Sequence, residues 1–400
     1  MKKIYYFDNN ASTFPSPSVI KAFTSTAHLG NPNNTHHLYG RMGQSLIDKS
    51  QKMISKHLDV PYEDIIFTNC ASEANNIVIQ CIMPYLKTLN NHSKNKNKNK
   101  KNEIIISTYE HNCLLSGVRA LSTRGFKIVE INPAQDGLMD PAKICTAISP
   151  RTIAVMCIHA HNELGILNDI SKIAHMVHKK NPRIWVHSDC VQSMGKYHIL
   201  PRKMGVDSMC WSAHKFNGFK RIGGLYIRNY HKIKENLTPL IYGGVGHDLI
   251  GGTPNPSLIY SMAIALSDAH KNRIRKNAIM ERMRQEIIDG LIKQKIIFKV
   301  LGASNKRYRM PNTLLIAFGM NVPSFCNGIL IDYLDKHNIA CSIGSACNTT
   351  NMYASHVLNA IGAPKEIKHG VIRISLGDLN TLPECRYLIK HLSNGVRMQK

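Results

Sequence analysis

Short apolar runs that each end in a cluster of polar residues recur through the middle of this chain. Residues 184–186 lead to the polar cluster 189–193, and residues 208–211 lead to the cluster 212–215. Runs of this length and composition are typical of buried strands. Because ligands of an open parallel sheet bind at the carboxyl ends of its strands, two such ends would deliver their polar groups to one crevice.

The two clusters supply an acid, Asp189, and a lysine, Lys215. A lysine can form a Schiff base with pyridoxal phosphate, and a carboxylate can partner the pyridinium nitrogen of that cofactor. The pair is therefore consistent with a pyridoxal-phosphate site. Most Asp and Lys residues lie on protein surfaces, so a surface position for both stays open on these two residues alone.

Strands and helices alternate over most of the chain. Further β-prone runs occupy residues 64–68, 104–106, 126–131 and 153–158. One intervening segment has the apolar spacing of a helix with a single buried face, at Ile170, Ile173, Ala174 and Val177. This alternation predicts an α/β fold with a mostly parallel sheet covered by helices on both faces.

The length of 400 residues is enough for one large domain and a smaller one. A glycine-rich segment at 242–252 ends the alternation, and a helical stretch from about 257 to 295 follows. We therefore predict a large domain over residues 17–256. A smaller α+β domain is predicted from residues 1–16 together with 257–400.

A candidate anion site follows the run 64–68. Cys70, Ala71 and Ser72 form a small-residue turn that opens an apolar helix. Free N–H groups and the helix dipole converge at such a point, which favours a phosphate. Ser72 could cap the helix, donate to a phosphate, or do both, and a plain N-cap explains it equally well when taken alone.

Residues 92–102 read His-Ser-Lys-Asn-Lys-Asn-Lys-Asn-Lys-Lys-Asn. A segment of this composition cannot bury enough apolar surface to order itself. We predict a disordered surface loop inserted between a helix and a strand. Contact with a polyanion is the open alternative.

The chain is strongly basic, with 51 Lys and Arg against 26 Asp and Glu and a formal net charge of +25. Such a charge invites a nucleic-acid hypothesis. The charge is spread along the chain, however, with one local concentration at 94–101, and no nucleic-acid-binding motif is evident. Nucleic acid is therefore not expected as the main ligand.

Composition and cysteine usage suggest an intracellular protein. No apolar run approaches the ~18 residues of a membrane span, and the first ten residues turn polar too early for a secretory signal. The 11 cysteines lack framework spacing and contain no Cys-x-x-Cys pair, so we expect mostly buried thiols and no metal site. The predicted location is the cytoplasm, without membrane attachment.

Eight short motifs occur in order along the chain: Asp-Asn-Asn-Ala-Ser-Thr at 8–13, Gly-Asn-Pro at 30–32, Tyr-Glu-His at 109–111, His-Asn-Glu-Leu-Gly at 161–165, His-Ser-Asp at 187–189, Ser-Ala-His-Lys at 212–215, Gly-Ser-Ala-Cys at 344–347 and Ile-Arg-Ile-Ser-Leu-Gly at 372–377. With them, the chain from Tyr5 to about Leu392 resembles the class V aminotransferase group of pyridoxal-phosphate enzymes. More narrowly, it resembles the cysteine desulfurases of the NifS and IscS type. The resemblance implies a fold-type I transferase, with a seven-stranded sheet in the large domain, and a homodimer.

The resemblance also implies a role for each matching residue. Lys215 would hold pyridoxal phosphate and then act as a base on the substrate Cα proton, while Asp189 would keep the pyridine nitrogen protonated. His111 would stack on the ring and help move protons, and Gln192 and Asn162 would contact the phenolic oxygen edge of the ring. Arg373 would bind the substrate carboxylate, and Asn31 would lie in the substrate-side loop. The phosphate would be bound by Ala71, Ser72, Ser212, His214 and a second subunit's Thr253.

Cys347 lies in a small, polar, turn-rich segment, which suits an exposed and movable thiol. By the resemblance, its thiolate would attack the sulfur of cofactor-bound L-cysteine, giving a persulfide on Cys347 and releasing L-alanine. The long loop around Cys347 resembles that of the IscS-like subgroup. This implies direct transfer of the sulfur to a scaffold or carrier protein, for iron–sulfur cluster assembly or tRNA thiolation.

The chain departs from the family pattern at several positions. Cys70 stands where the family usually has Gly, and Phe219 and Arg221 stand where it has Pro and Gly. Residues 250–253 replace the usual Arg-Ser-Gly-Thr.

Two rival functions stay open: a selenocysteine lyase or other class V enzyme, and a non-catalytic basic binding protein on this scaffold.

Overall fold

The computed structural model describes residues 3–91, 100–244, 248–320, 322, 324–343 and 355–399. Cys347 and most of the predicted insert at 92–102 therefore lie outside the described residues. Within the described ranges, no helix is long and apolar enough to cross a membrane. The ten cysteines that the structure describes are free thiols, and no group of three or more His, Cys, Asp or Glu in the same ranges could hold a metal ion.

Seven strands form the large sheet, in the spatial order β2-β8-β7-β6-β5-β3-β4. Their bounds are β2 Ile65–Thr68, β3 Glu103–Ser107, β4 Lys127–Ile131, β5 Thr152–Met156, β6 Trp185–Asp189, β7 Ser208–Ser212 and β8 Gly223–Ile227. Strands β7, β6, β5, β3 and β4 are parallel, and β8 runs antiparallel to β7 and β2. The predicted seven-stranded, mostly parallel sheet is confirmed.

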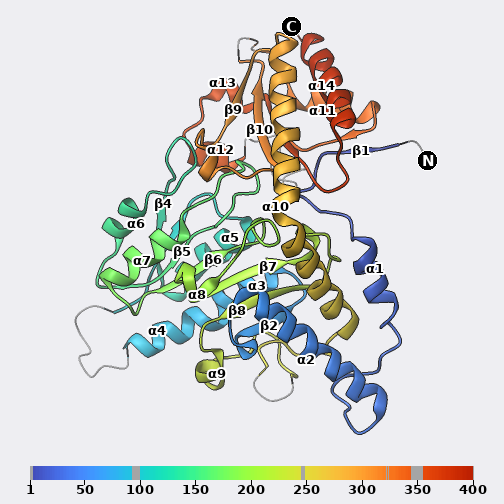
Figure 1. Ribbon diagram of the computed structural model, residues 1–400. Coiled ribbons are helices and arrows are strands. Elements are labelled where there is room, and N and C mark those ends of the chain that lie inside the picture. The colour runs from blue at the N-terminus through green and yellow to red at the C-terminus, as the bar shows by residue number, and fades with distance from the viewer. Residues whose placement is uncertain are drawn as a thin grey trace.

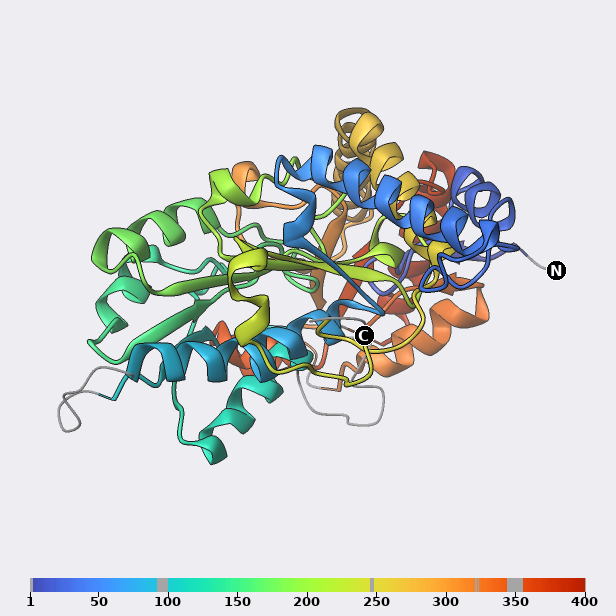
Figure 2. The same ribbon diagram turned by 90° about the horizontal axis from the view of Figure 1, so that it is seen from below.

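Helices cover both faces of this sheet (Figures 1 and 2). Alternate strand residues point to opposite faces, so Ile104 and Ile106 join one buried cluster and Ile105 joins another. The first cluster includes residues of α3 Ala71–Ile77, the π-helical turn η2 Val78–Ile82, α4 Met83–Asn91 and α5 Asn112–Ala120. The second includes residues of α2 Leu38–Leu58, α6 Pro141–Ala147, α7 Ile170–Lys180, α8 Pro201–Met204 and α10 Pro256–Lys293.

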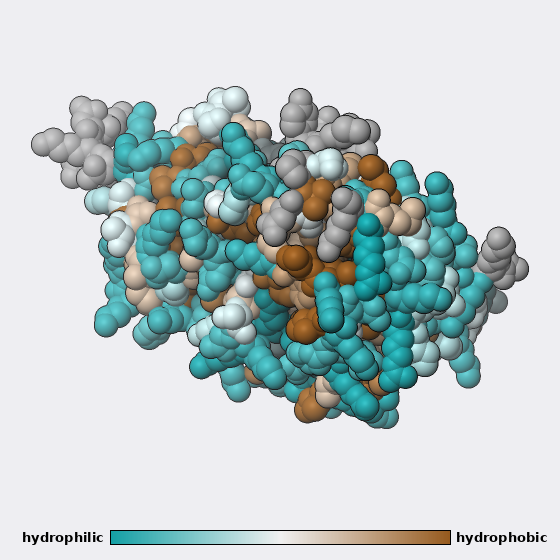
Figure 3. Space-filling view, turned by 90° about the horizontal axis from the view of Figure 1, so that it is seen from above, coloured by the Kyte–Doolittle hydropathy of each residue, from teal (hydrophilic) through white to brown (hydrophobic). Residues whose placement is uncertain are grey.

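A smaller antiparallel sheet lies above the large one in Figure 1, in the order β12-β10-β9. The elements of this part are β9 Phe298–Leu301, β10 Thr313–Phe318, β12 Val371–Ser375, the parallel pair β1 Tyr5–Tyr6 and β11 Ile339–Ala340, and the helices α11 Asn327–Lys336, α12 His356–Ala360, α13 Lys365–Lys368 and α14 Leu382–Arg397. Seen from above relative to Figure 1, the surface is largely hydrophilic, with apolar residues gathered near its centre (Figure 3).

Helix α10 links the two parts. It packs against α2 and α1 Pro17–Thr24 beside the large sheet and against α14 beside the small one (Figure 1). The remaining short elements are α9 Tyr230–Ile233 and the 3-10 turns η1 Tyr62–Asp64, η3 Leu121–Arg124, η4 Ala213–Lys215, η5 Lys234–Asn236 and η6 Lys306–Tyr308. The long helix predicted near 257–295 is therefore present, whereas the predicted boundaries between a large and a small domain stay a prediction.

One local expectation is wrong. Ser72 does not cap the helix after β2, because α3 begins at Ala71 and Cys70 occupies the N-cap position without a side-chain capping bond. The chain enters the helix earlier than the sequence suggested, since Cys70 has extended backbone angles and Ala71 is already helical. Ser72 lies in the first turn, and its hydroxyl has no capping role.

Gly165 lies in the loop after β5 and packs against Thr313 at the start of β10. Its φ is +63°, and a Cβ there would lie 2.7 Å from Thr313 Cβ. We expect Gly165→Ala to lower the free energy of unfolding by about 1–3 kcal/mol, because left-handed strain and a steric contact add. Gly125→Ala is the matched control, since φ is +74° there but only the mobile end of Lys87 is near. Equal thermal midpoints for the two variants would contradict this reading.

Candidate active site

A cavity of about 260 Å³ opens at the carboxyl ends of the parallel strands. Its walls come from the segment after β1, the start of α3, the loops after β3, β5, β6 and β7, the start of α12, and β12. Ten of the residues singled out from the sequence line it: Ala71, Ser72, His111, Asn162, Asp189, Gln192, Ser212, His214, Lys215 and Arg373. The ends of the parallel strands supply the groups between His111 and Lys215, while Ala71 and Ser72 come from α3 and Arg373 comes from β12 of the small sheet.

Three predicted site residues are not among those that line the cavity. Asn31 and Thr253 are exposed on this chain, and Asn31 Oδ1 accepts a hydrogen bond from Asn33 N (3.0 Å). Their roles stay predictions. Cys347 lies outside the described residues.

Lys215 follows β7 in the short turn η4. Its Nζ donates to the carbonyl oxygens of Asn10 (2.7 Å) and Ala11 (2.8 Å). The Asn10 carbonyl also accepts from Gln192 Nε2 at 2.9 Å. One backbone carbonyl from the N-terminal segment therefore orients two side chains that face the cavity, which the sequence pattern did not reveal.

Asp189 ends β6 and is buried. Its Oδ1 accepts from Val191 N (3.0 Å), and its Oδ2 accepts from Asn75 Nδ2 (3.2 Å). Asn75 Oδ1 in turn lies 3.0 Å from His187 Nε2. These two N–H donors hold the Asp189 carboxyl group in place at the cavity, where a carboxylate can pair with a cationic ring nitrogen. Asn75 is a positioning residue that sequence reasoning missed.

His111 is the N-cap of α5. Its Nδ1 accepts from Cys113 N at 3.3 Å and lies 3.0 Å from Cys113 Sγ. Because Nδ1 accepts a backbone N–H, we assign the proton of the neutral ring to Nε2. His111 can therefore present an N–H donor while Nδ1 stays tied to its own helix.

Two more polar groups face the expected phosphate end. Ser212 Oγ is buried and has no hydrogen-bond partner among the described residues. Burial, and then the positive charges of Lys215 and Lys220, lower the pKa of His214 to about 4. His214 is therefore a neutral donor or acceptor near pH 7, with Nδ1 3.3 Å from Ser12 Oγ.

Arg373 projects from β12 and is fully buried. Its Nη2 donates to Asp8 Oδ1 at 2.7 Å, and its Nη1 donates to Asn162 O at 3.3 Å. Its Nε has no partner within the described part of the chain. Arg373 keeps donor capacity toward the cavity, and its planar fork suits a carboxylate.

Two buried carboxyl groups in the cavity wall were quoted within sequence motifs but given no role. Burial raises the pKa of Glu110 to about 8 and also raises the pKa of Glu163. Glu110 Oε1 accepts from Ile158 N (2.7 Å) and from Ser107 Oγ. Glu110 Oε2 has no partner in the described ranges. Both groups sit close to His111 and are candidates to hold a proton.

Glu110 should make stability depend on pH. Its pKa is raised from an ordinary 4.5 to about 8, so its contribution is fully present below about pH 4.5 and is lost as the pH rises toward 8. Glu110→Gln keeps an acceptor for Ser107 and Ile158 but does not titrate. We expect this variant to lose less stability than the parent between pH 5 and pH 8, measured as urea midpoints. Parallel midpoint curves would rule out a raised pKa.

Comparison with known proteins agrees with this geometry. The sequence model of the family described as "Aminotransferase class-V" matches residues 5–388. The chain is 31% identical over 405 residues to "Cysteine desulfurase IscS" of Clostridium botulinum (strain Hall), covering 100% of this chain and 96% of that protein. Of the solved structures, a "NIFS-LIKE PROTEIN" has a TM-score of 0.85 and 28% identity, covering 99% of this chain and 100% of its own.

A second solved structure, "SspA in complex with cysteine", has a TM-score of 0.76 and 27% identity, covering 93% of this chain and 98% of its own. The family match spans nearly the whole chain and includes every strand that ends at the cavity. This chain therefore belongs to the class-V aminotransferase family, in the branch that includes the cysteine desulfurases.

Proposed function

We propose that this chain is a pyridoxal-phosphate-dependent cysteine desulfurase. It takes L-cysteine, releases L-alanine and leaves a persulfide on Cys347 for transfer to a sulfur acceptor. The observation that carries the proposal is the meeting of Lys215, Asp189 and Arg373 in one cavity. An amine, a carboxylate and a guanidinium are the three charged groups that an amino acid and this cofactor need.

The residues present fit the cofactor. Ser212 Oγ and Gln192 Oε1 are both buried at the cavity, and neither has a partner among the described residues. Unpaired buried polar atoms are costly, so a bound polar molecule would relieve both. When bound, pyridoxal phosphate supplies an electron-accepting ring conjugated to the substrate Cα.

The chain's own residues would act as follows. Lys215 supplies the amine that attaches the cofactor aldehyde and later takes the Cα proton, and Asp189 keeps the ring nitrogen protonated. Arg373 orients the substrate carboxylate. The remaining assignments are His111 for stacking and proton movement, Gln192 and Asn162 at the phenolic oxygen, Ala71, Ser72, Ser212 and His214 at the phosphate, Asn31 in the substrate-side loop, and the phosphate contact by Thr253 in the site of a second subunit.

Cys347 is proposed as the sulfur acceptor within the enzyme. Support comes from the described residues that flank 344–354, because they contact residues that line the cavity. Ser342 and Arg373 exchange backbone hydrogen bonds (3.1 and 2.6 Å). On the other side, His356 Nε2 lies 3.1 Å from Glu110 O. Over the whole reaction, one sulfur atom passes from L-cysteine to the Cys347 thiol, and the substrate carbon gains a hydrogen in its place.

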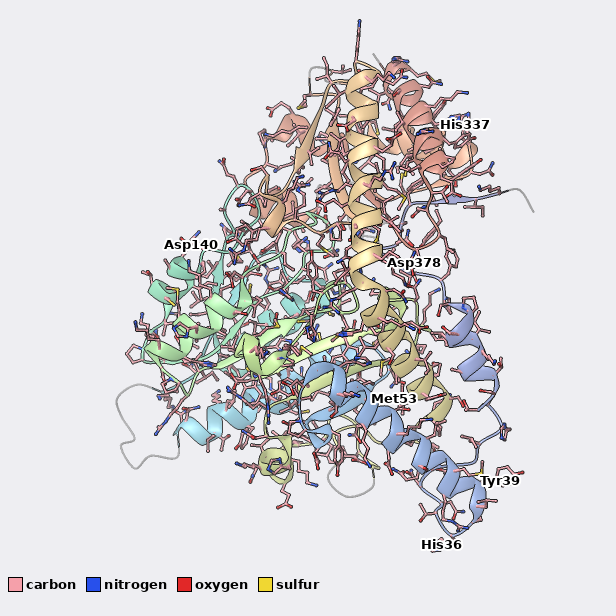
Figure 4. All side chains as sticks on the ribbon, viewed as in Figure 1. His36, Tyr39, Met53, Asp140, His337 and Asp378 are labelled. Atoms are coloured by element: carbon pink, nitrogen blue, oxygen red, sulfur yellow. The ribbon has the colours of Figure 1, made fainter. Side chains whose placement is uncertain are left out.

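We also propose a homodimer that delivers sulfur to a scaffold or carrier protein, for iron–sulfur cluster assembly or tRNA thiolation. Exposed apolar side chains at Leu38, Tyr39 and Met42 on α2 support a subunit contact. Figure 4 shows Tyr39 near the outer end of that helix. Ile241 and Tyr242, which are also exposed, precede the segment that carries Thr253. A cytoplasmic location stays a prediction.

Two variants separate the cofactor from the thiol. Lys215→Ala should abolish the yellow band of lysine-bound cofactor, because no amine remains to attach the aldehyde. Cys347→Ser should keep that band and lose sulfide formation from L-cysteine in the presence of a thiol reductant. Both are read by absorbance and sulfide assay. Full sulfide release by Cys347→Ser would instead favour a lyase that needs no enzyme thiol.

Arg373 should govern substrate affinity. In Arg373→Lys the ammonium cannot contact Asp8, Asn162 and a carboxylate as the planar fork does. We expect KM for L-cysteine to rise by about tenfold or more, with a smaller change in kcat. Steady-state kinetics of alanine formation measure both. An unchanged KM would remove Arg373 from the substrate site.

A further inference from the structure

A second lysine, Lys196, lies directly behind Lys215. Its Nζ donates to Gln192 O at 3.1 Å and to Lys215 O at 3.3 Å. Its own carbonyl accepts from Asn277 Nδ2 of α10 at 2.7 Å. Lys196 therefore ties the loop after β6 to the turn after β7 and anchors both to the long helix.

The surroundings of Lys196 are rich in positive charge. A second, small cavity of about 30 Å³ is lined by Lys196, Lys215, Arg273, Lys276 and Asp378, among others. Asp378 forms a close ion pair with Lys276 and so offers Lys196 little compensation. Figure 4 shows Asp378 beside α10. Burial, followed by the charge of Lys215, lowers the pKa of Lys196 to about 8.

Other charged or titratable groups also face this pair of lysines. His214 precedes Lys215 in the turn η4, and the charges of Lys215 and Lys220 both act on His214. Asp189 and His111 share the substrate-side cavity with Lys215. Asp189 favours a cation in that cavity, whereas Lys196 opposes one from behind. The equilibrium between the charged and uncharged forms of the Lys215 amine therefore depends on which neighbours carry charge.

We propose that Lys196 is a positioning residue that fixes the loops of Gln192 and Lys215 and, while it is protonated, favours the uncharged form of the Lys215 nitrogen. This inference rests on the proposed function, because it concerns how Lys215 is prepared as an amine. An uncharged amine is the form that attacks an aldehyde or takes a proton. The chemistry that Lys215 performs thus draws on a neighbour outside the substrate cavity.

The test compares Lys196→Met, which keeps length but removes charge, with Lys196→Arg, which keeps charge and can reach both carbonyls. The first readout is the pH dependence of the cofactor absorbance band from pH 5 to 9. We expect the pKa of that transition to rise by about one unit in Lys196→Met and to stay near the parent value in Lys196→Arg. Since Lys196 itself titrates near 8, the difference should be greatest below that pH.

The second readout needs no cofactor. Trace acetylation of Lys215 by acetic anhydride, quantified by peptide mass analysis across the same pH range, reports its uncharged fraction. Lys196→Met should shift this profile to higher pH. An unshifted profile in a folded Lys196→Met protein overturns the inference, even if cofactor affinity falls, because a purely structural role would leave the titration in place.

Two controls keep the outcomes distinct. If Lys196→Met does not fold, Lys196→Gln is measured in its place, because it is also neutral and can donate to one carbonyl. A parent protein that shows no cofactor band after addition of pyridoxal phosphate counts against the proposed function. The acetylation profile would still decide the effect of Lys196 on Lys215.

Discussion

The N-terminal segment 8–13 holds the two sheets together at the cavity. The Asn10 carbonyl accepts from Lys215 and Gln192 of the large sheet, and Asn10 Nδ2 donates to Thr313 Oγ1 of the small sheet at 2.8 Å. Asp8 pairs with Arg373 on β12 at 2.7 Å. This segment therefore gives the lysine, the amide and the guanidinium a common support, and the site depends on residues near the N-terminus.

Burial then decides which groups carry charge. It raises the pKa of Glu110 to about 8 and lowers the pKa of His161 and His214 to about 3 and 4. Asp189 is also buried, but both of its oxygens accept N–H donors. Of the residues that line the cavity, Glu110 and His214 are therefore neutral near pH 7, while Asp189, Lys215 and Arg373 are the groups that the proposed chemistry uses. This separation suits chemistry on a zwitterionic amino acid.

The parallel sheet and much of the candidate site follow from the sequence, because strand-end clusters such as those at Asp189 and Lys215 are local patterns. The family expectation is confirmed over residues 5–388. The supporting partners could not be predicted. Asn10 orients Lys215 and Gln192 through a backbone carbonyl that any residue could supply. Asn75 looks like an ordinary polar helix residue until α3 packs on the sheet and its side chain reaches Asp189. Glu110 gains its raised pKa chiefly from tertiary burial and then from the nearby Asp189 charge, and both arise only in the folded chain.

The central claim is that Lys215 and Asp189 serve a pyridoxal-phosphate desulfurase. Purified protein should be given pyridoxal phosphate, L-cysteine and a thiol reductant, with absorbance, alanine and sulfide followed together. The account predicts a yellow lysine-bound cofactor band and equal amounts of alanine and sulfide. A colourless protein that takes up no cofactor would contradict it, and cofactor uptake without alanine would point to a different substrate.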